Sequence, residues 1–403
     1  MNYNLAKMEA LSEKYGSPLY IFDEQAFLHN YDQLNKAMSS HYDKYQISYS
    51  FKTNYTPYIC SLLKELGAYA EVVSGMEYSL AKKLGYEDSH IIYNGPEKGV
   101  EGKKAFLAGS ILNVDNLDEL EIYCKEAEKN PEKHYKIGFR VNLDLGQGFV
   151  SRFGMDEDDL RAAFVRISGI SNLTVAGLHC HISRCRNLEA WRKRTEYMLR
   201  LSDRFFPEPP EYIDLGSGMY GSMAEEFAAQ FHDVPDYEDY ARVTAAIVAD
   251  HYRGRSGPML LTEPGTTLIN RYVECISRVE SIKKVNHHYF AVLNASIHNL
   301  GETATLKRLP VKLVPCGNSR TYYESIDLTG YTCLEQDILL PAYEGMLAVG
   351  DYIIFENTGG YSTVLKPPFI RPNCAMITEK AEGEYILIKK SETYEDIFHS
   401  YLY

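Results

Sequence analysis

The pattern of apolar and polar positions changes about two thirds of the way along the chain. Before residue 270, short apolar runs rich in β-branched and aromatic residues alternate with longer segments of helical periodicity. The predicted strands are Ile47–Lys52, Ala68–Val73, Ile91–Asn94, Ile111–Val114, Lys136–Val141, Val175–His181, Tyr212–Gly216 and Met259–Glu263. The predicted helices between them include Thr56–Leu66, Met76–Leu84, Asn116–Glu128, Leu188–Arg204 and Tyr237–Tyr252.

Strands that alternate with helices indicate right-handed βαβ units and a parallel sheet. Eight such units predict a (β/α)₈ barrel over residues 27–268, with an open doubly wound sheet as the alternative.

The pattern after residue 270 has period two, which predicts an antiparallel β domain over residues 269–403. Its alternating segments are Arg271–Ile282, Tyr289–Leu293, Val311–Val314 and Tyr352–Phe355. Residues 1–26 are assigned to the same domain, since a helix-like run at Leu5–Tyr15 and a short strand at Pro18–Phe22 precede the barrel.

Composition narrows the possible partners. The chain has 403 residues and a formal net charge of −13, which argues against nucleic acid and anionic membranes as partners. It contains no apolar run long enough to span a bilayer and no signal-peptide core near its N-terminus, so a cytoplasmic location is expected. The eight cysteines form no CxxC pair, which fits reduced thiols and gives no zinc signature.

Lys52 closes the first predicted strand of the barrel. A strand end that reaches water would explain the lysine without any chemistry. The alternative is a desolvated amine of lowered pKa that could form a Schiff base with an aldehyde cofactor. The other strand ends favour the second interpretation.

Polar residues occupy most of the predicted strand ends, where barrel enzymes carry their chemistry. They are Lys52, Glu71, Ser74, Glu77, Arg140, Asn142, His179, His181, Asp214 with the glycine-rich turn to Gly221, and Glu263 with Pro264 and Gly265. A glycine-rich turn lets backbone N–H groups approach an anion, although such a turn alone is more often a simple tight turn. The pair His179 and His181 could suggest a metal, but no third ligand is evident and no metal site is expected.

Seven segments together resemble the fold-type III pyridoxal-phosphate decarboxylases, most closely the diaminopimelate decarboxylases and more distantly the ornithine and arginine decarboxylases. They are Tyr49–Asn54, Glu71–Glu77, Ile92–Lys98, Ser151–Gly154, Gly177–Ile182, Asp214–Gly218 and Glu263–Gly265. Thr332-Cys333 and Thr358–Tyr361 continue the resemblance through the C-terminal part. It implies the barrel and β-domain fold that alanine racemase also has, with pyridoxal 5′-phosphate as cofactor.

The resemblance also implies roles for individual residues. Lys52 would hold the cofactor as a Schiff base, Glu263 would pair with the pyridine nitrogen, and His181 would stack on the ring. The other cofactor-binding residues would be Glu71, Arg140, Gly216, Gly218, Gly265 and Tyr361. Family members are homodimers with shared active sites, so Cys333 would act as a catalytic acid in the site of the partner subunit.

Departures from the family pattern bear on the substrate. Thr266 stands where the family has an arginine, and Leu334 stands where an acidic residue binds the distal ammonium of the substrate. Ala295–Glu302 also lacks the usual Arg-Pro element that grips a far carboxylate. Since each loss removes a charged partner, meso-diaminopimelate is not expected as substrate, and plain ornithine or lysine activity is doubtful.

Arg184 could restore a cation near the cofactor phosphate in place of the arginine missing at Thr266, or could bind an anionic substrate. Glu335 or Asp337 could take over the acidic role vacated at Leu334, and the unusual segment Lys366–Pro372 would line the substrate pocket. The expected function is decarboxylation of a larger amino acid or of an amino-acid-bearing intermediate of secondary metabolism. Such a substrate could be linked to a nucleotide or a carrier protein, or could be a siderophore intermediate. The alternatives are an amino-acid racemase and a non-catalytic cofactor carrier. A racemase of this fold usually has an arginine beside the pyridine nitrogen, at the place of Glu263.

Overall fold

The computed structural model describes residues 3–146, 148–381 and 383–402. The chain divides into two compact units. The barrel unit comprises Tyr31–Gly221 and Asp233–Thr267, and the β unit comprises Met1–Asn30, Ser222–His232 and Leu268–Tyr403. The boundaries predicted from the sequence, 27–268 for one domain and 1–26 with 269–403 for the other, stay a prediction, and residues 1, 2 and 403 lie outside the described residues.

The barrel unit contains a closed barrel of eight parallel strands, as predicted. They are β2 (Tyr45–Ser50), β3 (Tyr69–Val72), β4 (Ile91–Tyr93), β5 (Ile111–Val114), β6 (Tyr135–Arg140), β7 (Leu173–His179), β8 (Tyr212–Asp214) and β9 (Met259–Thr262). β2 pairs in parallel with β9, which closes the sheet and excludes the open doubly wound alternative. Because all the strands are parallel, their C-terminal ends meet at one end of the barrel.

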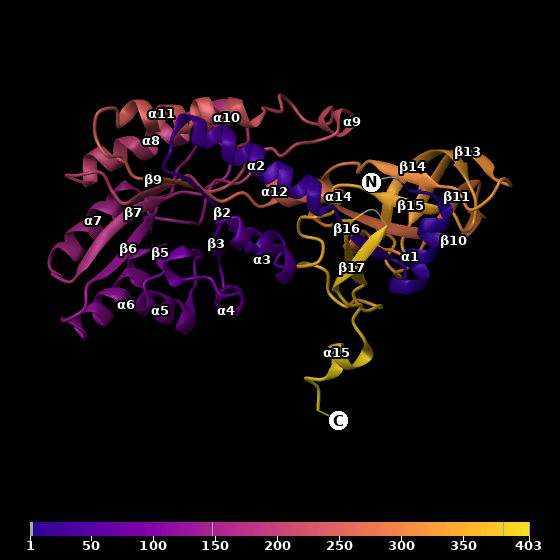
Figure 1. Cartoon of the computed structure of the whole chain (residues 1–403), viewed down its shortest axis with the longest axis horizontal. Helices are drawn as coiled ribbons and strands as arrows, with labels where there is room; N and C mark the ends of the chain where they lie inside the picture. Colours follow the sequence, from indigo (N-terminus) through magenta and orange to yellow (C-terminus); the bar gives the residue numbers. More distant parts are fainter. Residues whose placement is uncertain (1–2, 147, 382, 403) are drawn as a thin grey trace. The chain divides into compact units, whose positions relative to one another are not determined.

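Helices surround these strands (Figure 1). They are α3 (Pro57–Glu65), α4 (Gly75–Lys83), α5 (Gly99–Ala108), α6 (Leu117–Glu128), α7 (Glu157–Ser168), α8 (Leu188–Phe205), α10 (Tyr237–Val243) and α11 (Ala245–His251). The single helix predicted over Tyr237–Tyr252 is wrong, since Thr244 separates α10 from α11. The Thr244 hydroxyl donates to the carbonyl of Tyr240 at 2.6 Å, a local bond that competes with regular helix geometry.

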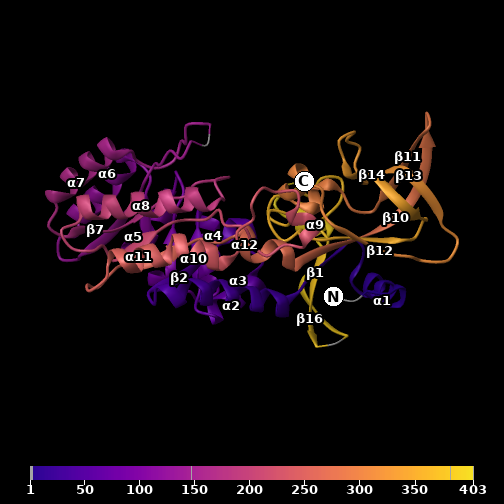
Figure 2. The ribbon, with the colours of Figure 1, turned by 90° about the horizontal axis from the view of Figure 1, so that it is seen from above.

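The β unit is built on a nine-stranded sheet. Its strands are β1 (Leu19–Phe22), β10 (Val273–Val285), β11 (His288–Leu293), β12 (Val311–Val314), β13 (Thr321–Thr329), β14 (Ile338–Leu347), β15 (Tyr352–Phe355), β16 (Ala375–Ala381) and β17 (Glu384–Lys389). The predicted strand before the barrel is confirmed as a member of this sheet, because β1 pairs with β10 and β16. Most strand pairs of this sheet are antiparallel, as predicted. Two pairs are parallel, β1 with β16 and β11 with β13, and the ribbons of β11 and β13 lie side by side in Figure 2.

The remaining α-helices vary in length. They are α1 (Leu5–Tyr15), α2 (Glu24–His41), α9 (Glu225–Ala228), α12 (Thr266–Ile269), α13 (Ile297–Leu300), α14 (Glu302–Leu306) and α15 (Tyr394–Phe398). α1 places Met8 and Leu11 in a core with Leu19 and Ile21 of β1. No helix in the described part of the chain has both the length and the apolar character needed to cross a bilayer.

Candidate active site at the C-terminal ends of the barrel strands

Lys52 lies in a short 3-10 helix, Phe51–Thr53, that follows β2 directly. Its Nζ lies 2.6 Å from Oε2 of Glu71, a residue of β3, and about a third of the lysine side chain is exposed. The Ser50 hydroxyl donates to the same Glu71 oxygen at 2.5 Å. Lys52 is therefore an ion-paired and reachable amine, which corrects the expectation of a desolvated one.

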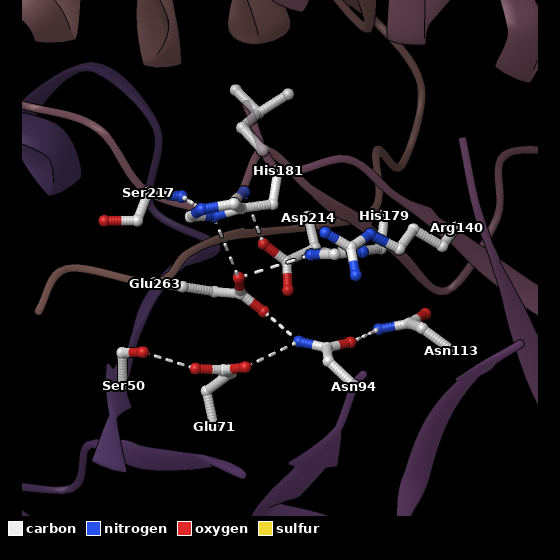
Figure 3. A network of polar contacts seen from close by, with 12 residues as sticks. Ser50, Glu71, Asn94, Asn113, Arg140, His179, His181, Asp214, Ser217 and Glu263 are labelled. Atoms are coloured by element: carbon white, nitrogen blue, oxygen red, sulfur yellow. Dashed lines mark hydrogen bonds and ion pairs between the residues drawn. The ribbon is translucent and has the colours of Figure 1, made fainter. Parts of the chain in front are cut away.

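Asn94, directly after β4, connects Glu71 with Glu263 (Figure 3). Its Nδ2 donates to Glu263 Oε1 at 2.5 Å and to Glu71 Oε1 at 3.2 Å. Asn113 of β5 in turn donates its Nδ2 to Asn94 Oδ1 at 2.9 Å. An ionised carboxylate can only accept hydrogen bonds, so the orientation of both amides is fixed.

Tyr212 of β8 completes this chain of hydrogen bonds by donating to Asn113 Oδ1 at 2.6 Å. Glycines on two neighbouring strands make room for it. A Cβ built on Gly138 would lie 1.8 Å from the Tyr212 oxygen, and one built on Gly177 would lie 2.6 Å from its ring. The barrel interior thus accommodates a polar chain, directed from Tyr212 through Asn113 and Asn94 toward two carboxylates.

Glu263 is the ionised carboxylate of a buried cluster that also holds His179 and Asp214. Burial opposes the ionisation of Glu263, but His179, whose Nε2 lies 3.2 Å from Glu263 Oε2, and the Lys52 ammonium hold its pKa below the ordinary range. Burial, and then the Glu263 charge, hold the pKa of Asp214 well above its ordinary value. One proton therefore resides on Asp214 while Glu263 carries the charge.

The same cluster bears on metal binding. Ligand atoms of His179, Asp214 and Glu263 lie within 4.8 Å of one another, a grouping that the sequence argument missed because it paired His179 with His181. A metal ligand must be deprotonated, so an ion bound here would have to displace the proton that the raised pKa of Asp214 favours.

His181 lies just beyond β7 with a neutral ring. The Ser217 N–H donates to His181 Nδ1 at 3.1 Å, so the ring proton is on Nε2. Burial, followed by the charge of Lys52, holds the pKa of His181 well below its ordinary value. The side chain is 23% exposed, which leaves part of the ring available for a ligand to contact.

The glycine-rich loop after β8 has two residues in the left-handed region. Gly216 has φ +67° and Gly218 has φ +108°. A Cβ on Gly216 would lie 2.2 Å from the Cys180 carbonyl, and one on Gly265, after β9, would lie 2.0 Å from the Thr53 hydroxyl oxygen. Only glycine fits these positions, as an anion-binding cradle requires.

Arg140 ends β6 and is buried. One of its nitrogens, Nη1, lies 3.4 Å from Asp115 Oδ1, and the guanidinium lies 4.6 Å from the centre of the Phe153 ring. Asp115 Oδ1 also accepts from the Gly154 N–H at 3.1 Å, which ties the loop after β6 to this ion pair. Arg140 is one of the cations that lower the pKa of His181, after burial and Lys52.

Four of the predicted site residues belong to the β unit: Cys333, Glu335, Asp337 and Tyr361. Cys333 is exposed on the loop between β13 and β14, and Tyr361 is partly buried with φ +58°. Asp337 is buried, and its carboxylate accepts from the Thr332 hydroxyl at 2.6 Å and from the Ile297 N–H at 2.7 Å. These bonds anchor the Cys333 loop, and they argue against Asp337 as a free partner for a substrate ammonium.

Arg184 is exposed with φ +69°, and the described residues offer it no ion pair. Glu335 is also exposed. Both stay candidates for substrate binding, and no hydrogen bond or ion pair with another described residue fixes either side chain in place.

The structure brings together Lys52, Glu71, His181 and Glu263, all of which the sequence had selected. It adds Asn94, Asn113 and Tyr212, together with Arg194 of α8, which is fully buried and donates to the carbonyls of Leu215 and Ser217 in the glycine-rich loop. Asn94 and Asn113 could have been selected as polar residues in or just after predicted strands, but nothing in the sequence shows that Tyr212 and Arg194 are buried.

The residues present fit the cofactor implied by the resemblance. They include a reachable lysine amine, an ionised buried carboxylate, a neutral imidazole and a glycine cradle, the protein groups expected around the aldehyde, ring nitrogen, ring face and phosphate of pyridoxal phosphate.

Comparison with known families gives two matches that together cover most of the chain. Residues 28–270 match the family model described as pyridoxal-dependent decarboxylase, pyridoxal binding domain. Residues 267–359 match the model described as pyridoxal-dependent decarboxylase, C-terminal sheet domain.

Similar proteins extend over nearly the whole length. Diaminopimelate decarboxylase of Aquifex aeolicus is 25% identical over 406 residues, covering 97% of this chain and 93% of that protein. The enzyme of the same name from Methanothermobacter thermautotrophicus is 26% identical, covering 96% and 92%.

Solved structures share the fold. Diaminopimelate decarboxylase from M. jannaschii in complex with L-lysine has a TM-score of 0.85 at 21% identity, covering 98% of this chain and 94% of that one. Lysine/ornithine decarboxylase from Vibrio vulnificus, complexed with putrescine, has a TM-score of 0.75 at 18% identity, covering 93% and 97%.

Proposed function

The chain belongs to the pyridoxal-dependent decarboxylase family, and on that premise we propose that its barrel site removes the α-carboxyl group of an amino acid, or of an intermediate that carries one, as CO₂. The observation that carries the proposal is the convergence of Lys52, Glu71, Glu263 and His181 at one end of the barrel. Pyridoxal phosphate, when bound, supplies an electron sink for the bond to the departing carboxyl group.

Each residue has a role that its surroundings support. Lys52 would hold the cofactor aldehyde, with Glu71 Oε2, 2.6 Å from Nζ, placed to accept the proton of the amine. The ionised Glu263 would keep a proton on the ring nitrogen, and the neutral ring of His181 would pack on the cofactor ring. Arg140 adds positive charge beside the histidine.

The β unit would contribute from the partner subunit of a homodimer. Cys333, on the exposed loop anchored by Asp337, would deliver a proton to the carbon that loses CO₂. Tyr361 would add a hydrogen bond to the cofactor phosphate. This shared-site dimer rests on the family resemblance.

The substrate is proposed to differ from meso-diaminopimelate, although the similar curated proteins carry that name. Support comes from Leu334, which is exposed and apolar where a distal ammonium would need a carboxylate, and from Thr266. Glu335, the next residue along, is exposed and could meet a cation on a larger amino acid, whether free or linked to a nucleotide or a carrier.

The test combines absorption spectroscopy with collection of CO₂. The purified protein, supplied with pyridoxal phosphate, is expected to show a visible absorption band that one amino acid shifts while CO₂ is released. The panel runs from meso-diaminopimelate, lysine and ornithine to nucleotide-linked and carrier-linked amino acids. Turnover of meso-diaminopimelate above all others would refute the substrate proposal alone.

Lysine variants test the site itself. Lys52→Arg keeps a cation beside Glu71 but cannot bond to the aldehyde, so the band and CO₂ release should disappear. Lys36→Arg, on an exposed lysine of α2, is the matched control and should change neither. A Lys52→Arg protein that still releases CO₂ would overturn the proposed chemistry.

A further inference from the structure

Arg194, on α8, is a fully buried cation without an acidic partner. Its side chain has no exposed area, and among the described residues no carboxylate forms a salt bridge with it, although the charge of Glu263 acts on it from farther away. Burial lowers its pKa, yet a guanidinium stays charged in proteins. Burying an uncompensated charge is costly, so a group that neutralises it is expected nearby.

The Arg194 guanidinium lies directly behind the glycine-rich loop. Nη1 donates to the carbonyls of Leu215 and Ser217, both at 2.8 Å, and Nη2 donates to the carbonyl of Ile182 at 3.3 Å. A Cβ built on Gly218 would lie 3.9 Å from Nη2. The arginine therefore holds loop carbonyls on the side of α8.

Trp191, one helical turn earlier, holds the same loop. Its Nε1 donates to the Gly218 carbonyl at 3.2 Å, and the Arg194 guanidinium lies 4.1 Å from the centre of its ring. Residues three apart on a helix share a face, so both side chains of α8 hydrogen-bond to the same loop.

The opposite side of the loop offers unpaired donors. In a trans peptide the N–H points away from the C=O, so the N–H groups of Gly218 and Met219 point away from α8. Both residues are buried, and neither N–H has an acceptor among the described residues. Buried donors of this kind normally have a partner, and adjacent free N–H groups are a common way to bind an anion.

We propose that Arg194 is the charge of the phosphate site in this protein: it acts from behind the loop, aligns the N–H groups of Gly218 and Met219, and is neutralised when the cofactor phosphate binds. The inference rests on the proposed function. It takes the place of Arg184, which sequence reasoning offered as a substitute for the arginine missing at Thr266. Arg194 would be a positioning residue, because its Nη1 and Nη2 already donate to backbone carbonyls and would act on the phosphate only through the loop.

The test compares pyridoxal phosphate with pyridoxal, which has the same ring and aldehyde but no phosphate. Binding to apo-protein is followed by absorbance and by the rise in Tm, for wild type, Arg194→Met and Arg194→Lys. Arg194→Met is expected to weaken pyridoxal phosphate by about tenfold or more and pyridoxal by less than about threefold. Arg194→Lys should recover part of the difference, because it keeps the charge without the planar fork.

Arg200→Met, on the exposed side of the same helix, is the matched control and should leave the ratio of the two affinities unchanged. Inorganic phosphate gives a second readout, since it should raise the Tm of the wild-type apo-protein and not that of Arg194→Met. Equal losses for both ligands, or an unchanged ratio, would overturn the inference, whereas a wild-type protein that binds neither ligand would overturn the proposed function.

Discussion

The hydrogen bonds of Asn94 make a prediction that depends on the direction of a single amide. Asn94→Asp keeps the size and shape of the side chain but replaces the donor that faces Glu71 and Glu263 with an oxygen. At neutral pH the variant places a third carboxylate 2.5–3.2 Å from two others. Three acceptors then face one another without a proton between them.

The size of the effect follows from these distances. Two like charges about 3 Å apart repel by roughly 5 kcal/mol at an effective dielectric constant of about 20, and each pKa unit corresponds to about 1.4 kcal/mol. The repulsion is therefore sufficient to raise the pKa of one carboxyl group by about three units, into the neutral range. Below that pKa the shared proton restores a donor at position 94, and above it the donor is lost.

Activity of Asn94→Asp should consequently rise as the pH falls from about 8 to about 5.5. Asn94→Leu, which has no donor at any pH, should be impaired throughout this range. The assay measures kcat/KM and the absorbance of the bound cofactor against pH for both variants and for wild type. The new titration should be present in Asn94→Asp alone.

Asn172→Asp is the matched control for the burial of a new carboxylate. Asn172 is buried and donates its Nδ2 to three backbone carbonyls, just before β7 and away from the strand ends that carry the site. That variant should lose stability while the pH profile of its activity stays as in wild type. An Asn94→Asp profile parallel to that of wild type would refute the assigned direction of the hydrogen bonds.

Three further predictions concern stability and loop geometry. Burial and the nearby charge of Glu71 raise the pKa of Glu77 to about 7, so the folded protein loses stability as the pH rises from the unfolded pKa of Glu77 toward 7. Glu77→Gln should therefore raise the free energy of unfolding by about 3 kcal/mol at pH 8 and change it little at pH 5, as measured by denaturant unfolding. Gly216→Ala should abolish binding of pyridoxal phosphate, because the added Cβ would clash with the Cys180 carbonyl. In the control Gly109→Ala, where φ is +91° and no atom lies near the added Cβ, the protein should lose only about 1 kcal/mol of stability and bind the cofactor normally. Asp337→Ala should lower the free energy of unfolding by about 2–4 kcal/mol, measured by thermal unfolding, because it removes the hydrogen bonds that anchor the Cys333 loop. Glu335→Ala should leave stability unchanged, and equal effects of the two variants would contradict the assigned anchor.

The barrel was predictable because its signals are local. Runs of β-branched residues and helical periodicity placed all eight strands within a few residues of their observed bounds, and β5 at its observed bounds. The parallel pairing of β1 with β16 was not predictable in the same way. It joins residues 19–22 to residues 375–378, and no local pattern records the direction of a partner so distant in sequence.

The charged part of the site was predictable for a different reason. Lysine, glutamate and histidine are unusual at the ends of buried strands, so Lys52, Glu263 and His181 were conspicuous in the sequence. Arg194 was not, because an arginine on an amphipathic helix usually faces solvent. Arg184 was chosen from the sequence to make up for the arginine missing at Thr266, whereas burial and hydrogen bonding to the loop identify Arg194.

The charges of the barrel site also account for one another in a way that supports its assignment. Lys52 is paired with Glu71, Arg140 is paired with Asp115, and the proton of Asp214 leaves that carboxyl neutral. Two buried charges of the described residues then lie outside these pairs: the anion of Glu263, whose ion-pair contacts are histidine rings, and the cation of Arg194, which donates to loop carbonyls. Pyridoxal phosphate carries complementary charges, a protonated ring nitrogen and a phosphate, so binding it would neutralise both.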